Sequence, residues 1–263
     1  MKPIRYLQKD SVAKYFNRTA NVYNDWYSDN SWLGYAFIVR KRRVLEFFDK
    51  ASGKVLDVGC GPGIMAKDLR EQQCKFWGID LSSEMINQGR ELYKDFEDVD
   101  LQTGTAEELP FQDESFDCTM SMGVIEFVDD DQKALREIVR VTKQDGTIIL
   151  AFMNKYSAFR LWRDFVFYPL TSWARPIMYR LTKRARKPHI HQRTYSEQSI
   201  RNFLKSENCE FLDVVYCNFN IFLAPLEHLF PRLSVMVAKK LEKLGRSKLK
   251  NLGTAFVVKA RKK

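Results

Sequence analysis

The residues best suited to chemistry lie in a glycine-rich segment, KVLDVGCGPG, at positions 54–63. A short apolar run leads directly into the glycines, and a helical pattern follows them. Glycine lets the backbone turn sharply and lets a ligand approach where a Cβ would stand in the way. The segment therefore predicts a ligand-binding loop between a strand and a helix.

The spacing of these glycines argues against two common nucleotide loops. A dinucleotide fingerprint, G-x-G-x-x-G, would need a third glycine where Ile64 stands. A P-loop would end in Gly-Lys-Ser or Gly-Lys-Thr, whereas positions 62–64 read Pro-Gly-Ile. The pattern present is instead Asp-x-Gly-x-Gly-x-Gly, starting at Asp57.

A second candidate binding group is Asp80, which ends the next apolar run in the segment WGIDLS at 77–82. A carboxylate at a strand end, about 20 residues after the loop, can accept hydrogen bonds from both hydroxyls of a ribose. An alternative role would be to cap the following helix, but Ser82 is better placed for that. Asp80 is therefore predicted to bind a ribose.

Two more segments follow in order: GTAEELPF at 104–111, and a strand-then-helix pattern from Phe116 to Glu137. Together with the glycine loop and Asp80, they resemble the class I S-adenosylmethionine-dependent methyltransferases, in the style of the ubiquinone/menaquinone-type subgroup. The resemblance is close over residues 50–153. It extends more loosely to residues 14–25, which look like that subgroup's cofactor lid.

The resemblance implies S-adenosylmethionine as the cofactor and the 104–111 segment as its adenine-binding stretch. The residues predicted to contact the cofactor come from the lid, the loop and the strand ends. They are Tyr15, Tyr23, Asp57, Gly59, Cys60, Gly61, Gly63, Asp80, Leu81, Met85, Thr105, Ala106, Glu107, Ser121 and Met122.

The chain departs from the subgroup at two positions. Thr105 stands where an aspartate usually receives the adenine amino group, so that contact would be made without charge or by a neighbour. Glu126-Phe127 stands where the subgroup often has a histidine pair or Glu-His, which removes a possible histidine base or metal ligand.

The sulfonium methyl group is already activated, so the protein must mainly align a nucleophile with it. A hydroxyl or carboxyl acceptor would also need a base to take its proton. The candidates for this catalytic role are Glu126, His191 and Tyr195, with His189 as a further histidine. No third ligand accompanies the two histidines, so no metal site is predicted. The acidic run 129–131 is predicted to cap a helix.

The acceptor is less well defined by the sequence. Methyltransferases that act on nucleic-acid base amines carry an Asn/Asp-Pro-Pro-Tyr-type motif after the fourth strand, and residues 121–125 read SMGVI instead. We expect O-methylation of a hydrophobic or lipid-like small molecule. N-methylation of a small amine and a non-catalytic, cofactor-binding partner subunit remain alternatives.

Charge is distributed unevenly along the chain. The net charge is +10, with −6 in residues 1–150 and +16 in residues 151–263. Apolar and basic side chains alternate in 155–193 and 232–250, which suits a substrate or an anionic membrane surface better than a nucleic acid. Solvated lysines beside helices that pack on the domain would give the same pattern.

The fold class predicted is α/β: a seven-stranded, mostly parallel, Rossmann-like methyltransferase sheet. Short apolar runs separated by helical patterns indicate such a sheet, with an antiparallel strand near the C-terminus. A single domain, 1–263, is expected. It would comprise a helical lid (1–50), a cofactor-binding core (51–153) and basic insertions at 154–195 and 220–250.

The location expected for the chain is the cytoplasm, with peripheral contact at a membrane surface as a further expectation. Its five cysteines form no C-x-x-C pair and are typical of reduced, buried thiols. Neither a signal peptide nor an apolar run of about 18 residues is predicted.

Overall fold

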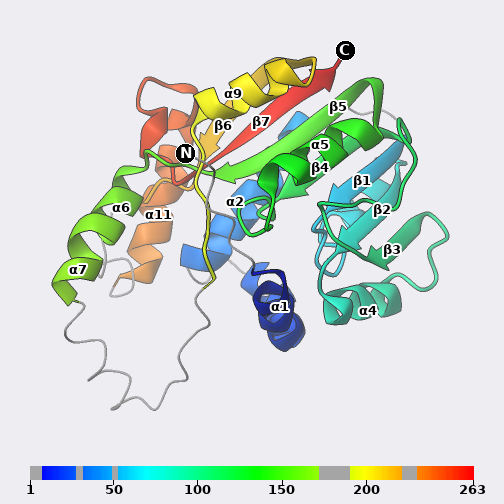
Figure 1. Cartoon of the computed structure of the whole chain (residues 1–263). Helices are drawn as coiled ribbons and strands as arrows, with labels where there is room; N and C mark the ends of the chain where they lie inside the picture. Colours follow the sequence, from blue (N-terminus) through cyan, green and yellow to red (C-terminus); the bar gives the residue numbers. More distant parts are fainter. Residues whose placement is uncertain (1–7, 28–31, 49–52, 172–189, 221–229) are drawn as a thin grey trace.

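The structure is a computed structural model that describes residues 8–27, 32–48, 53–171, 190–220 and 230–263. Its centre is one sheet of seven strands (Figure 1). The strands are β1 (Lys54–Val58), β2 (Lys75–Asp80), β3 (Val99–Thr103), β4 (Phe116–Met122), β5 (Thr142–Met153), β6 (Cys209–Cys217) and β7 (Ala255–Lys262).

The strands are ordered β3-β2-β1-β4-β5-β7-β6 across the sheet. All neighbours are parallel except that β7 runs antiparallel to both β5 and β6. This confirms the predicted mostly parallel sheet with an antiparallel strand near the C-terminus. The strand order reverses between β1 and β4, and a crevice for ligands forms where the carboxyl ends of parallel strands meet such a reversal.

Helices precede the sheet, connect its strands and fill the insertions. The α-helices are α1 (Lys9–Tyr23), α2 (Trp32–Phe47), α3 (Ala66–Arg70), α4 (Ser83–Leu92), α5 (Asp131–Val141), α6 (Ala158–Trp162), α7 (Tyr168–Thr171), α9 (Glu197–Ser206) and α11 (Pro231–Leu241). The 3₁₀ helices are η1 (Asn24–Tyr27), η3 (Glu242–Arg246) and η4 (Lys250–Leu252), and η2 (Arg163–Phe167) is a π-helix.

The sheet is buried on both faces because successive residues of its strands point to opposite sides. Along β5, Ile148 and Leu150 join the core beneath α5 and α9, whereas Ile149 and Ala151 join the core beneath α2 and α3. In Figure 1, α5 and α9 lie in front of the sheet and α2 lies behind it. Two apolar layers therefore hold the strand ends rigidly in place.

The basic stretch near 232–250, whose apolar residues follow helical spacing, is helical in three pieces. The helix α11 ends at Leu241, and the 3₁₀ helices η3 and η4 follow it. Glu242 is buried, and its Oε1 accepts a hydrogen bond from the backbone N–H of Asn218 at 2.9 Å. A side chain at Gly245 would meet the carbonyl oxygen of Tyr216 at 2.3 Å. These tertiary contacts outweigh the helical pattern.

The first basic insertion is helical where it is described: α6, η2 and α7 follow one another from Ala158 to Thr171. Residues 172–189, which include much of the basic run predicted to meet an anionic partner, lie outside the described residues. Within the described part of the chain, no helix is long and apolar enough to cross a membrane.

Candidate functional site

The glycine loop after β1 has backbone conformations that side chains rarely adopt. Gly59, Gly61 and Gly63 have φ angles of +80°, +55° and +82°. A Cβ at Gly59 would lie 1.8 Å from a methyl carbon of Val124, and one at Gly61 would lie 3.2 Å from the Tyr23 ring. Glycine is therefore required here for both conformation and space.

The carboxylate of Asp80 is held at the end of β2 by backbone donors. Its Oδ2 accepts from the N–H of Gly61 at 2.9 Å, and its Oδ1 accepts from the N–H of Ser82 at 2.8 Å. Burial raises the pKa of Asp80, while these backbone hydrogen bonds act in the opposite direction. Each oxygen retains a lone pair, so the carboxylate can accept two ligand hydroxyls. Ser82 caps α4, as predicted, by accepting from the N–H of Met85.

Asp57 lies at the base of the loop and is only 3% exposed. Its Oδ1 has no hydrogen-bond partner within the described structure. Burial, together with the charge of Asp80, raises the pKa of Asp57 to about 7. A buried carboxylate oxygen without a donor is costly, so this position suits a cationic or hydrogen-donating ligand group.

The segment after β3 is braced by Glu107. The Thr105 hydroxyl donates to Glu107 Oε2, and Glu107 Oε1 accepts from the backbone N–H of Asp129 at 2.8 Å. Because Glu107 is engaged by these donors, it positions the pocket wall rather than offering a free carboxylate. Thr105 keeps a lone pair that can accept from a ligand amino group.

The N-terminal helix α1 lies across the carboxyl ends of the strands, where the sequence predicted a lid (Figure 1). Gln8, just before the helix, donates to the carbonyl oxygens of Phe127 and His191, both at 2.9 Å, and accepts from the His191 N–H. Further along, Asn17 Oδ1 accepts from the Ser82 hydroxyl at 2.6 Å. The lid is thus attached at both the β4–α5 loop and α4.

These elements line one cavity at the carboxyl ends of the strands. Ten of the predicted cofactor contacts line it: Tyr23, Gly59, Gly61, Asp80, Leu81, Met85, Thr105, Ala106, Glu107 and Met122. Ten further residues, none of them among the predicted cofactor contacts, complete the wall: Lys9, Val12, Phe16, Ile79, Gly104, Gly123, Val124, Phe127, Val128 and Asp129. Phe16 lines the cavity and Tyr15 does not, because adjacent helical residues point about 100° apart.

The other four predicted contacts lie behind the wall. Asp57 lies beneath the loop, and the Cys60 thiol is buried and donates to the Gly61 carbonyl oxygen. A side chain at Gly63 would point at Tyr93, on the far side of the loop from the cavity. Ser121 donates to the carbonyl oxygen of Val58 at 2.9 Å and so links two strands.

A cluster of aromatic rings adjoins the loop side of the cavity. Tyr23 packs on Trp26 and Tyr27, with ring centroids 5.2 and 5.9 Å away, and all three contact Phe37 of α2. Of these rings only Tyr23 lines the cavity itself, and Trp26 and Tyr27 pack against it from behind.

Gly123, just beyond β4, separates the cavity from a group of buried charges. A Cβ there would lie 3.2 Å from Arg40 Nη1 and 3.8 Å from Glu126 Oε1. Arg40 is 9% exposed and Glu126 is fully buried. Burial raises the pKa of Glu126, whereas the charges of Arg40 and Arg160 lower it. Arg40 was missed because four basic residues, 40–43, stand together in the sequence and nothing there marks the one that faces inward.

The remaining candidate bases do not line the cavity. The Tyr195 hydroxyl bonds to the carbonyl oxygen of Ile125 at 3.2 Å and to Asp131 Oδ2 at 2.9 Å. His191 is fixed to Gln8 through its backbone, and His189 lies outside the described residues. Among the residues that can be described, no three His, Cys, Asp or Glu side chains are grouped to hold a metal ion.

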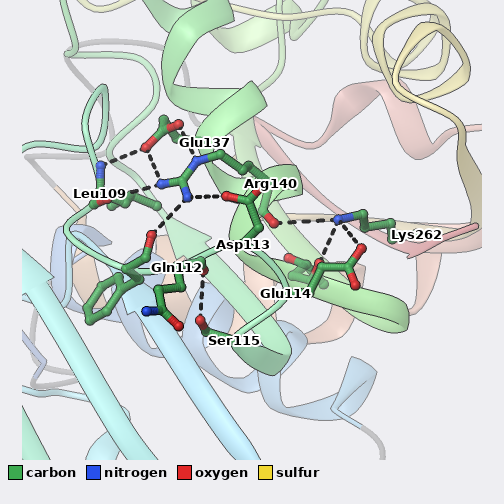
Figure 2. Close-up of polar contacts among 10 residues, drawn as sticks. Leu109, Gln112, Asp113, Glu114, Ser115, Glu137, Arg140 and Lys262 are labelled. Atoms are coloured by element: carbon green, nitrogen blue, oxygen red, sulfur yellow. Dashed lines mark hydrogen bonds and ion pairs between the residues drawn. The ribbon is translucent and has the colours of Figure 1, made fainter.

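The stretch that follows the Thr105 wall is anchored by Arg140 of α5 (Figure 2). Its guanidinium donates to the carbonyl oxygens of Leu109 and Phe111 at 3.1 and 2.8 Å. It also pairs with Glu137 and Asp113, both at 2.7 Å, and Glu137 in turn accepts from the Leu109 N–H. This network fixes residues 109–113 to α5.

Comparison with known proteins also identifies a methyltransferase domain in the central part of the chain. Residues 56–150 match the family model described as a methyltransferase domain. The chain is 31% identical over 157 residues to a malonyl-[acyl-carrier protein] O-methyltransferase of Erwinia billingiae, covering 59% of this chain and 58% of that protein. It is 42% identical over 106 residues to the ubiquinone/menaquinone biosynthesis C-methyltransferase of Citrifermentans bemidjiense, covering 38% and 45% of the two chains.

The matched regions thus span about half the length of these curated relatives. Among solved structures, a S-adenosylmethionine-dependent methyltransferase from Thermotoga maritima superimposes with a TM-score of 0.59 at 23% identity. That match covers 95% of this chain and 99% of the other, and it establishes the fold.

Proposed function

We propose that this chain is an S-adenosylmethionine-dependent methyltransferase that methylates a hydrophobic or lipid-like small molecule, since residues 56–150 match a methyltransferase domain. O-methylation is the leading form of this proposal. The observation that carries it is the cavity at the carboxyl ends of β1, β2 and β4, which brings Asp80, the glycine loop and Glu126 to one place.

The residues of the cavity fit S-adenosylmethionine group by group. Asp80 can accept the two ribose hydroxyls, and Thr105 can accept from the adenine amino group. The amino-acid end of the cofactor carries both an ammonium and a carboxylate. The unpartnered oxygen of Asp57 suits the first, and the buried guanidinium of Arg40 suits the second.

When bound, the cofactor supplies an activated methyl group on a sulfonium. The protein then has to exclude water and hold the acceptor in line, which can supply most of the reduction in the barrier. The closed lid, attached through Gln8 and Asn17, serves the first task. In this proposal Glu126 serves the second by accepting a hydrogen bond, and finally the proton, from the acceptor's nucleophile.

N-methylation of a small amine is the second candidate, and the same carboxylate favours it. Both oxygens of Glu126 lack hydrogen-bond partners among the described residues. A buried, unpaired carboxylate would attract an ammonium as readily as a hydroxyl. A non-catalytic, cofactor-binding partner subunit would need the same cavity, so turnover with a labelled methyl donor is what separates it from an enzyme.

The lipid-like character of the acceptor rests on the helices outside the core. Phe165 of η2 is 75% exposed and Leu170 of α7 is 68% exposed. On the other insertion, Phe230, Leu233 and Met236 are about half exposed, next to the lysines at the end of α11. Apolar side chains beside cations are typical of proteins that lie on an anionic membrane surface. We therefore include peripheral membrane contact in the proposal.

Calorimetric titration with S-adenosylmethionine and, separately, NAD tests the cofactor assignment. We expect the first alone to bind. A labelled methyl donor would then be used to screen lipid and small-molecule acceptors for turnover. If neither cofactor binds, the assignment of the cavity is wrong.

A further inference from the structure

Two buried charges remain near the cavity after the cofactor's own needs are met. Asp57 and Arg40 suit the ammonium and the carboxylate of S-adenosylmethionine, which leaves Glu126 and Arg160. Glu126 is fully buried and Arg160 is 7% exposed. Ionised groups at such depth are usually paired, because moving an unpaired ion out of water into the protein interior costs several kcal/mol.

Glu126 and Arg160 are close enough to influence each other but do not form an ion pair. The charge of each shifts the pKa of the other. Among the described residues Glu126 makes no hydrogen bond of normal geometry, although the Gln192 side chain lies near enough to lower its pKa by hydrogen bonding. Arg160 makes one long contact, from Nη1 to Gln192 Oε1 at 3.4 Å. The two charged side chains therefore do not contact each other directly, and the Gln192 side chain lies near both.

Their position relative to the cavity is fixed by the β4–α5 loop. Gly123 lines the cavity, and a Cβ there would lie 3.8 Å from Glu126 Oε1. Phe127, the residue after Glu126, also lines it. The backbone N–H of Arg193 donates to the Glu126 carbonyl oxygen at 3.0 Å, which ties the Gln192 segment to this loop. Glu126 therefore lies next to the cavity wall, and Gln192, which Arg160 contacts, lies on the segment joined to the same loop.

We propose that Glu126 and Arg160, bridged by Gln192, form the acceptor subsite, and that the acceptor carries an anionic oxygen group beside its amine or hydroxyl nucleophile. The carboxylate or phosphate of the acceptor pairs with Arg160, and the nucleophile donates to Glu126. Arginine suits this role because its planar fork matches carboxylate and phosphate oxygens. The inference rests on the proposed methyl transfer and narrows it to an anionic amine or alcohol, either free or as a lipid headgroup.

Binding of small probes to the protein saturated with S-adenosylhomocysteine tests this subsite without turnover. The probes are O-phosphoethanolamine and β-alanine, which carry both groups, and ethanolamine and ethyl phosphate, which carry one each. We expect the two-group probes to bind at least ten-fold more tightly than either one-group probe. If none of the four binds, or if the one-group probes bind as well, the inference is wrong.

Two variants, each replacing one charged side chain with a neutral one, test which residue binds which group of the probes. Arg160→Gln should weaken ethyl phosphate and the two-group probes about ten-fold or more and leave ethanolamine unchanged. Glu126→Gln should weaken ethanolamine and leave ethyl phosphate unchanged. Arg163→Gln is the matched control, because Arg163 lies on the same helical segment and pairs with Asp164. An equal loss in Arg163→Gln would show a general charge effect and overturn the subsite.

Further controls separate folding, cofactor binding and probe source. Arg160→Lys keeps the charge and should recover part of the affinity, whereas a purely structural role would give no recovery. All variants should bind S-adenosylhomocysteine as wild type does. Failure of the wild type to bind it would instead refute the proposed function. Vesicles containing phosphatidylethanolamine, compared with free O-phosphoethanolamine, distinguish a lipid headgroup from a free acceptor.

Discussion

The carboxylate of Asp80 accepts a hydrogen bond from the backbone N–H of Gly61 at 2.9 Å, which joins the end of β2 to the turn of the glycine loop. The two parts of the sequence motif therefore do not act separately. The loop orients the carboxylate, and the carboxylate holds the loop in a conformation with positive φ at Gly61. A second bond, from the N–H of Ser82, fixes the other oxygen.

Removal of this carboxylate should weaken cofactor binding. We expect Asp80→Ala to raise the Kd for S-adenosylmethionine about ten- to a hundred-fold, because hydrogen bonds to a charged group contribute about 1.5–3 kcal/mol. Calorimetry measures the change. Asp100→Ala, an exposed carboxylate on β3, is the matched control and should bind normally. Unchanged affinity in Asp80→Ala would mean that Asp80 does not bind the ribose.

Acidification should weaken cofactor binding through Asp57. Its pKa is raised to about 7 by burial and by Asp80, so the free protein holds a proton there below neutral pH. A cationic ammonium favours the ionised form, so binding below pH 7 must release that proton. We expect the Kd to rise by up to ten-fold per pH unit below about 7. Calorimetry in buffers of different ionisation enthalpy measures how many protons are released when the cofactor binds.

The raised pKa of Asp57 also makes the stability of the cofactor-free protein depend on pH. A carboxyl whose pKa is raised on folding binds protons more tightly in the folded state, so its contribution to stability falls as pH rises from about 4 to about 7. Asp57→Asn should remove both effects and leave a smaller dependence from Asp80, whose pKa is also raised by burial. A pH profile identical to that of wild type would rule out Asp57 as the titrating group.

Much of the fold was predictable because its signals are local. The apolar runs fixed the strands, and Ser82 and Asp130 cap α4 and α5 as their positions predicted. The charged residues around the acceptor were harder to find. Arg40 and Arg160 look like many other basic residues in the chain, and only the tertiary packing of the folded chain buries them. Gln8 is likewise ordinary in sequence, and its role depends on segments more than 100 residues away.

Membrane contact should depend on the exposed apolar side chains of the first insertion. We expect the double substitution Phe165→Ser and Leu170→Ser to reduce binding to anionic vesicles about ten-fold or more, since each side chain would otherwise bury apolar surface in the bilayer. Co-sedimentation with phosphatidylglycerol vesicles measures this. Leu92→Ser, an exposed leucine at the end of α4, is the control. Equal binding by the insertion variant and wild type would contradict the membrane contact.

The Arg140 network should support both stability and the adenine side of the cavity (Figure 2). Arg140→Gln loses the forked contacts to the carbonyl oxygens of Leu109 and Phe111 and leaves Glu137 without its main charge partner. We expect the free energy of unfolding to fall by about 1–3 kcal/mol, measured by urea denaturation, because several hydrogen bonds to a charged group are lost together.

The stability difference between wild type and Arg140→Gln should become smaller at acidic pH. Arg140 lowers the pKa of Glu137, so the stabilisation is present at neutral pH and disappears as pH falls through that lowered pKa. Because residues 109–113 continue the wall that contains Thr105, the affinity for adenosine should fall as well, while the Asp80 contacts remain intact. An exposed control, Arg42→Gln on α2, pairs loosely with Glu46 at 3.8 Å and should change neither property. If Arg140→Gln lowers stability but leaves adenosine affinity unchanged, the network supports the fold alone and does not position the cofactor wall.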